Sequence, residues 1–120
     1  MALYVDGFVI PVPKKKVAAY RRIASKACKL WLEHGALDYK ECVGDDLKVE
    51  KVTPFTKGIG TKAGETVFFS WITYKSRAHR DKVNAAVMKD PRLHAMCDPK
   101  DMPFDCARML CGGFKVVVGG

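Results

Sequence analysis

Residues 2–12 are rich in β-branched, aromatic and other apolar residues, which predicts a β-strand whose side chains point alternately to two sides. Pro11 and Pro13 are expected to end this strand, because neither residue can donate a hydrogen bond to a neighbouring strand. The two sides of the strand are Leu3, Val5, Gly7 and Val9 on one, and Tyr4, Asp6, Phe8 and Ile10 on the other.

The pattern then changes to a helical period. From about residue 14 to residue 34, apolar residues recur every three or four positions, and the lysines and arginines fall on the opposite side. This predicts an amphipathic helix that packs on an apolar surface and shows water a basic face. The helix should end at His34-Gly35, because glycine fits the left-handed conformation just past a helix end.

The rest of the chain predicts three more strands and two more helices. ALDYKECV (36–43), VFFSWITY (67–74) and residues 112–118 have strand character, whereas residues 77–89 form a helix capped by Ser76, and PRLHAM (91–96) a short one. Residues 44–66 contain many glycines and are predicted to form a long loop with some strand near 49–57. The G-x-G-x-x-x-G spacing at 58–64 is expected to be a loop that could cover a cavity.

This order of elements predicts the fold class. Two strand–helix–strand halves in about 110 residues indicate an α+β ferredoxin-like sandwich, with two main helices on one face of an antiparallel sheet. We expect one domain over residues 1–120.

The face of the sheet away from the helices should also be apolar. Both sides of the strand at 67–74 are apolar, so its pattern does not decide whether Ser70 or Trp71 faces the helices. An exposed apolar face of this size is rare in monomers. We therefore expect a homodimer, a second copy packing sheet to sheet so that the two sheets form a dimeric α+β barrel.

Charge and cysteine content add two alternatives. The net charge is +8, and seven Lys or Arg residues lie between residues 14 and 29, which could bind a polyanion such as nucleic acid. No aromatic residues are interleaved on that face and no nucleic-acid-binding signature appears, so nucleic acid is the less favoured partner. The five cysteines are expected to be reduced and mostly buried. A zinc site at His94, Cys97, Cys106 and Cys111 lacks the usual paired short spacings.

No apolar run approaches the ~20 residues that cross a bilayer. The N-terminus carries an acid where a signal peptide needs basic residues, so we expect a cytoplasmic protein without membrane contact.

Several longer segments carry a resemblance. YVDGFVIPVP at 4–13, GALDYKEC at 35–42, VFFSWITYKSRAHRD at 67–81, DPR at 90–92 and MPFDCARM-x2-GGF at 102–114 resemble the YbaA-like family of uncharacterised bacterial proteins. The resemblance implies a dimeric α+β barrel and no established activity. That wider group includes cofactor-independent monooxygenases and lactone isomerases, which share a cavity between helices and sheet.

The resemblance therefore implies a small organic ligand in that cavity, either bound or transformed. Because the sequence has no metal or dinucleotide motif, we expect no cofactor, and any chemistry would be proton transfer or cofactor-free oxygen chemistry. A non-catalytic structural or regulatory dimer is the remaining alternative.

Asp6 is the first candidate for catalysis, because burial in mid-strand would favour its protonated form. Alternatively, Asp6 accepts structural hydrogen bonds or pairs with Arg108. Arg108 is the second candidate, as a cation for a carboxylate-bearing ligand at the cavity mouth. Asp105 is expected to cap a short turn, and residues 102–104 to close one end of the cavity. The expected lining residues are Tyr4, Phe8, Ser70, Trp71, Tyr74 and Phe104.

Overall fold

The computed structural model describes residues 2–96, 98 and 100–119. In chain order the elements are β1 (Tyr4–Pro13), the 3-10 turn η1 (Lys14–Lys16), α1 (Val17–Glu33), β2 (Asp38–Val43), α2 (Phe55–Ile59), β3 (Glu65–Tyr74), α3 (Arg77–Lys89), α4 (Pro91–Met96), the 3-10 turn η2 (Cys106–Arg108) and β4 (Leu110–Lys115).

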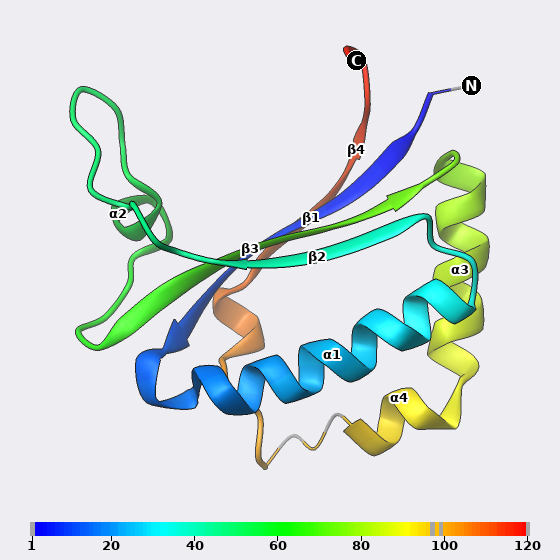
Figure 1. Cartoon of the computed structure of the whole chain (residues 1–120), viewed down its shortest axis with the longest axis horizontal. Helices are drawn as coiled ribbons and strands as arrows, with labels where there is room; N and C mark the ends of the chain where they lie inside the picture. The colour runs from blue at the N-terminus through cyan, green and yellow to red at the C-terminus, as the bar shows by residue number, and fades with distance from the viewer. Residues whose placement is uncertain (1, 97, 99, 120) are drawn as a thin grey trace.

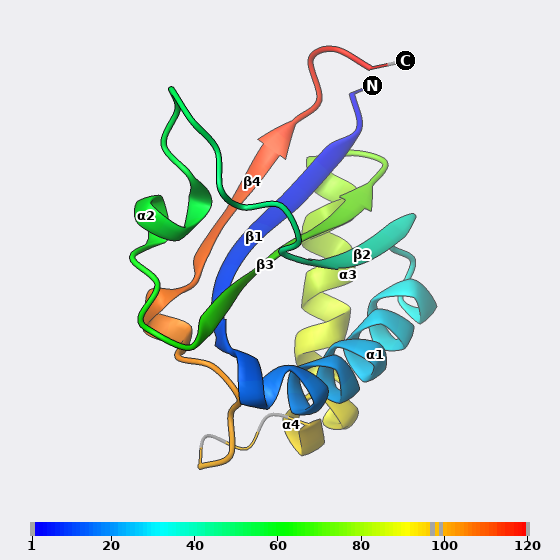
Figure 2. The same ribbon diagram turned by 60° about the vertical axis from the view of Figure 1, so that its left-hand side comes forward.

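The four strands form one antiparallel sheet in the order β2-β3-β1-β4. The helices α1, α3 and α4 cover one face of the sheet, which we call the inner face, and α2 lies beyond the other face (Figures 1 and 2). The two chain ends lie side by side, where Val116 N–H donates to Leu3 O at 3.0 Å. This arrangement confirms the predicted α+β ferredoxin-like sandwich.

Two local predictions need correction. Residues 49–57 contain no strand; Pro54 is the N-cap of the short helix α2, and Gly60, in the left-handed conformation with φ of 70°, is its C-cap. The first strand continues through Pro11, which pairs with Val67 of β3, and ends at Pro13. It can do so because β4 pairs with β1 only as far as Val9, so the prolines lie where β1 has no neighbour on that side.

The alternation of side chains decides which residues face the helices. Tyr4, Ile10 and Val12 of β1 are buried on the inner face, as are Phe68, Ile72 and Tyr74 of β3. Tyr20, Ala24 and Leu30 of α1 pack against them. Ser70 is 3% exposed on this face, whereas Phe69 on the other face is 44% exposed. The ambiguity between Ser70 and Trp71 is thereby resolved: Ser70 faces the helices.

The substitution Gly113→Ala should destabilise the protein, because Gly113 leaves room for the buried Tyr4 ring. A Cβ atom at Gly113 would lie 2.8 Å from Cε2 and 2.9 Å from Cζ of Tyr4. We expect a loss of about 1–3 kcal/mol in the free energy of unfolding, measured by urea denaturation. Gly58→Ala is the matched control, because a Cβ there meets nothing within 4 Å. Equal stability of the two variants would contradict this account.

Candidate functional site

A cavity of about 160 Å³ lies between α1 and the inner face of the sheet. Most of its wall is hydrocarbon, from residues including Ile10, Ile23, Ala27, Ile72 and Met96. Met102 and Phe104 also line it, and the Phe104 ring packs edge-on against Tyr20 with ring centroids 5.5 Å apart. The lining includes three of the expected residues: Phe8, Ser70 and Phe104.

A carboxylate held by two phenols is the main polar feature of the cavity. Tyr20 on α1 donates to Oε1 of Glu41, and Tyr39 donates to Oε2, both at 2.8 Å. All three residues line the cavity. Burial, reinforced by the negative charge of Glu41, raises the pKa of both phenols far above the ordinary value, so they stay protonated and neutral.

Sequence reasoning missed this group of residues. Tyr39 and Glu41 alternate on one side of β2, and Tyr20 lies on the apolar side of α1, so each position was visible in the pattern. Glu41 and Cys42 are neighbours in β2 and therefore point to opposite sides of the sheet, and Cys42 is exposed. The pattern did not show that the helix places Tyr20 over Glu41.

Asp6 is buried, as predicted, and lies in a neighbouring cluster rather than in the cavity wall. Its Oδ1 is 3.4 Å from a terminal nitrogen of Arg80, and its Oδ2 accepts from Asn84 at 3.4 Å. Arg80 also donates to the Tyr4 hydroxyl at 3.3 Å and stacks over the Tyr4 ring. The ion-pair partner of Asp6 is therefore Arg80 on α3, and the pairing with Arg108 considered as an alternative was wrong.

Asn84 connects this cluster to the core. Its Oδ1 accepts from Trp31 Nε1 at 3.0 Å and from the Tyr74 hydroxyl at 3.2 Å. Tyr4 and Tyr74 thus belong to the Asp6 cluster, and the structure separates them from the cavity-lining set.

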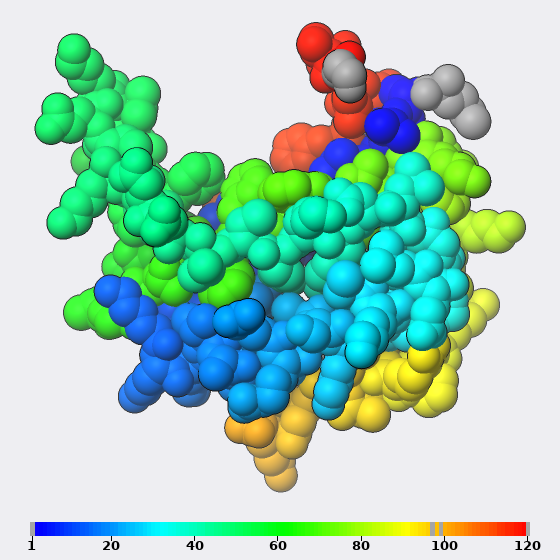
Figure 3. All heavy atoms as spheres, viewed as in Figure 1, coloured from blue at the N-terminus to red at the C-terminus, as the bar shows by residue number. Residues whose placement is uncertain are grey.

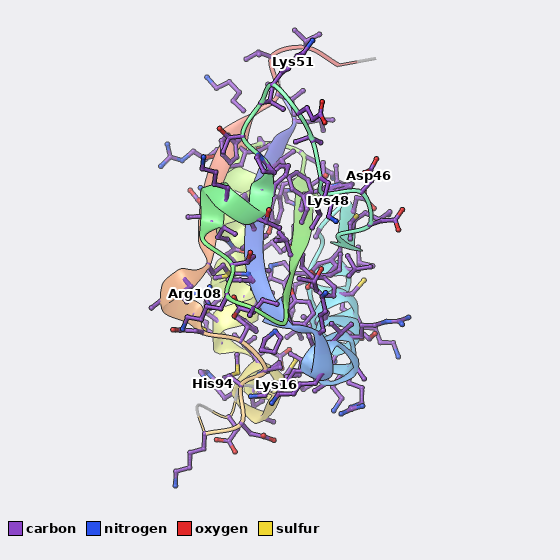
Figure 4. The ribbon with its side chains drawn as sticks, turned by 90° about the vertical axis from the view of Figure 1, so that its left-hand side faces the viewer. Lys16, Asp46, Lys48, Lys51, His94 and Arg108 are labelled. Carbon is purple, nitrogen blue, oxygen red and sulfur yellow. The ribbon has the colours of Figure 1, made fainter. Side chains whose placement is uncertain are left out.

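Arg108 lies at the other end of the sheet and has its own partners. It forms a two-bonded ion pair with Glu65 at 2.6 and 2.8 Å, and it donates to Gly60 O at 3.0 Å. Figure 4 shows Arg108 beside the chain that leads from α2 into β3. Asp105 accepts from Ala107 N–H at 3.0 Å and caps η2, which confirms its predicted role. Arg108 and Asp6 are not brought together.

Trp71 lies on the outer face of the sheet, opposite Ser70. There it follows Phe69 and Phe55 in a row of aromatic rings, with centroid distances of 5.7 and 5.9 Å. Phe69 and Trp71 belong to an apolar hollow of about 600 Å³ on the outer face, whose lining also includes Val5, Val9, Leu110 and Phe114. The glycine-containing segment around α2 lies on this side, so it does not cover the cavity under α1 (Figure 1).

Seven exposed cations form a basic surface on η1 and α1, as predicted: Lys14, Lys15, Lys16, Arg21, Arg22, Lys26 and Lys29. None of them forms an ion pair with another described residue. Within the described ranges, the structure contains no helix with the length and apolar character needed to cross a membrane.

The cysteines are less buried than predicted. Cys42, Cys106 and Cys111 are exposed and Cys28 is half-buried. Cys42 and Cys111 lie on the two edge strands β2 and β4, Cys106 lies in the turn η2, and Cys28 lies on α1. Cys97 of the zinc alternative lies outside the described residues. The part of the chain that the structure describes has no group of three or more His, Cys, Asp or Glu residues placed to hold a metal ion.

Acid should weaken the contribution of Glu65 to stability. The Arg108 guanidinium lowers the pKa of Glu65 from 4.5 to about 2. Because the folded-state pKa is lower than the unfolded one, this stabilisation is present above pH 4.5 and is lost as the pH falls toward 2.

Arg108→Gln should therefore have a lower free energy of unfolding than the parent at pH 7. The difference in free energy between the two proteins should become smaller between pH 5 and pH 2. Chemical denaturation at a series of pH values measures this, with Lys89→Gln as a control that removes a remote cation. If the difference in free energy of unfolding is the same at every pH, Arg108 does not stabilise the protein through Glu65.

Comparison with known proteins finds relatives along nearly the whole chain. A family model described as a protein of unknown function (DUF1428) matches residues 3–106. The uncharacterized protein YbaA of Escherichia coli (strain K12) is 44% identical over 115 residues, which are 96% of this chain and 97% of YbaA. YbaA of Shigella flexneri matches to the same extent.

Among solved structures, a dimeric ferredoxin-like protein from an uncultured marine organism aligns over 100% of both chains with a TM-score of 0.57. Its sequence identity is 11%, so this likeness supports the ferredoxin-like fold alone. The family match and the YbaA relatives confirm the resemblance seen in the sequence: the chain belongs to the DUF1428 family of proteins of unknown function.

Proposed function

We propose that this protein binds a small organic ligand in the cavity between α1 and the sheet. The observation that carries the proposal is the composition of the cavity wall, which is apolar except for Glu41, its two tyrosines, Ser70 and Trp31. The indole N–H of Trp31 already donates to Asn84. Small-molecule sites typically combine an apolar wall with a few polar groups that fix the ligand's orientation. Asp6 and Arg108 are engaged in ion pairs outside the wall, so the polar group that would meet a ligand is Glu41.

We also propose that the functional unit is a homodimer joined through the outer face of the sheet. Phe69, Leu110 and Phe114 are 44%, 55% and 63% exposed there, around the apolar hollow. Contiguous apolar surface of this kind is typical of protein–protein interfaces. The ferredoxin-like neighbour from the marine organism is described as dimeric, which supports a second copy as the occupant.

The basic surface supports a polyanion partner less well. Its cations are exposed and unpaired among the described residues, but the apolar side of α1 is used to cover the sheet. No aromatic side chain stands among the cations to stack on a base. The positive charge of this surface is the one feature that favours polyanion binding. The volume of the cavity, its apolar lining and the position of its polar groups all favour the binding of a small organic ligand.

Filling the cavity should abolish ligand binding. Ala27 lines the cavity, so Ala27→Leu would place extra side-chain volume in it. We expect single-ring compounds such as toluene and benzyl alcohol to perturb the amide NMR spectrum of the parent and to leave that of Ala27→Leu unchanged. Ala18→Leu, at an exposed position of the same helix, should bind like the parent. If neither compound changes the amide NMR spectrum of the parent, the proposed function is contradicted.

A charge on the outer face should separate the dimer. Phe114→Asp places a carboxylate within the apolar surface, and we expect it to shift the protein from dimer to monomer at micromolar concentration in analytical ultracentrifugation. Leu32→Asp is the control, because Leu32 is 43% exposed on α1, away from this face. A parent protein that sediments as a monomer would contradict the dimer proposal.

A further inference from the structure

We propose that Glu41 is the recognition group of the cavity, and that its ligand is an uncharged, ring-sized apolar molecule carrying a hydroxyl group, such as an aromatic or alicyclic alcohol. This inference rests on the proposed function, because it names the chemical class of ligand for the same cavity.

The hydrogen-bonding groups of the cavity wall favour a donor. An ionised carboxylate accepts about four hydrogen bonds and donates none. The two tyrosines use one position on each oxygen of Glu41, which leaves the others for a ligand. The hydroxyl groups of Tyr20 and Tyr39 already donate their hydrogen bonds to Glu41, so toward the cavity their oxygens can only accept. A ligand hydroxyl can donate to any of these oxygens.

Ser70 provides the complementary contact. It lies directly opposite Glu41 in the pairing of β2 with β3, and it is 3% exposed. Ser70 also lines the cavity. A serine hydroxyl can both donate and accept a hydrogen bond. A ligand oxygen that donates to Glu41 could accept from Ser70, so one hydroxyl group would satisfy both residues.

The volume of the cavity limits the size of the ligand. A cavity of about 150 Å³ lined by apolar side chains can hold benzene. The cavity here, about 160 Å³, therefore fits a single ring with one small substituent. Trp31, Phe8 and Phe104 provide aromatic surface for such a ring.

Charges near the cavity disfavour ionised ligands. An anionic ligand would be repelled by Glu41. On the other side of Glu41, a groove of about 610 Å³ runs along the surface between α1 and the edge strand β2, and Glu41 and Tyr39 line both spaces. Arg21, Lys29 and Lys40 line this groove and would repel an ammonium group that approaches through it. Figure 3 shows α1 and β2 side by side on this face. An uncharged hydroxyl meets neither repulsion.

The experiment compares four compounds with the same ring: toluene, benzyl alcohol, benzylamine and benzoate. Their dissociation constants are measured by NMR titration of the full-length protein at pH 7. We expect benzyl alcohol to bind about tenfold more tightly than toluene, because a hydrogen bond to a charged group contributes that much. Benzylamine should bind more weakly than benzyl alcohol, and benzoate should bind most weakly.

Variants then assign the preference to Glu41. Glu41→Gln replaces an acceptor by an amide that also donates, and it should reduce the tenfold preference for benzyl alcohol over toluene to about equal affinity. Tyr39→Phe removes one donor to Glu41 but keeps the carboxylate, so this variant should still prefer benzyl alcohol to toluene. It provides a second measurement if Glu41→Gln does not fold.

The failures are distinguishable. If none of the compounds binds the parent, the proposed function fails. If toluene and benzyl alcohol bind the parent equally, or if benzylamine binds most tightly, the cavity proposal survives and the assignment of an uncharged hydroxyl ligand to Glu41 is overturned.

Discussion

The burial of a carboxylate in the middle of β1 is the constraint on which the arrangement of the helices depends. Asp6 is 5% exposed, and a buried charge needs a counter-ion and hydrogen-bond donors. Both come from α3, as Arg80 and Asn84. Because Asn84 in turn accepts from Trp31 on α1 and from Tyr74 on β3, one cluster fixes two helices and two strands relative to one another. This cluster orients the helices that enclose the cavity.

The inner face of the sheet therefore carries two carboxylates with different surroundings. Asp6 faces a cation, and its ion pair contributes to holding α3 against the sheet. Glu41 faces two neutral phenols, which orient it without neutralising its charge. An ion pair satisfies both of its members, whereas a carboxylate bound only by neutral donors remains a strong acceptor. This difference in partners is the reason why we propose Glu41, and not Asp6, as the carboxylate that meets a ligand.

The sequence predicted elements well where a local signal marks their ends. The bounds of α3 and α4 were predicted correctly because Ser76 caps α3, accepting from His79 N–H at 3.1 Å, and Asp90-Pro91 starts α4. Residues 49–57 were expected to include some strand, but no strand pairs with this segment, and Val49 and Val52 are exposed. A strand requires a neighbour, which local sequence does not specify.

The candidate site shows the same limit. Burial of Asp6 followed from its position in an apolar strand, but its partner depends on how α3 packs, so the sequence did not distinguish Arg80 from Arg108. The Tyr20–Glu41 bond joins residues 21 positions apart and required the helix to be placed on the sheet. Local alternation predicts which way a side chain points, and tertiary packing decides what it meets.

The position of Phe8 connects the two proposed surfaces. It lies on β1 at the centre of the sheet and contributes to both the cavity under α1 and the apolar hollow on the outer face. Its neighbours across the sheet are Ser70 on β3 and Cys111 on β4. Because close-packed interiors transmit small displacements, a second copy pressed on the outer face would also set the position of the cavity wall. Dimer formation and ligand binding would then share one strand, and the rigidity of the cavity would depend on the sheet being covered on both faces.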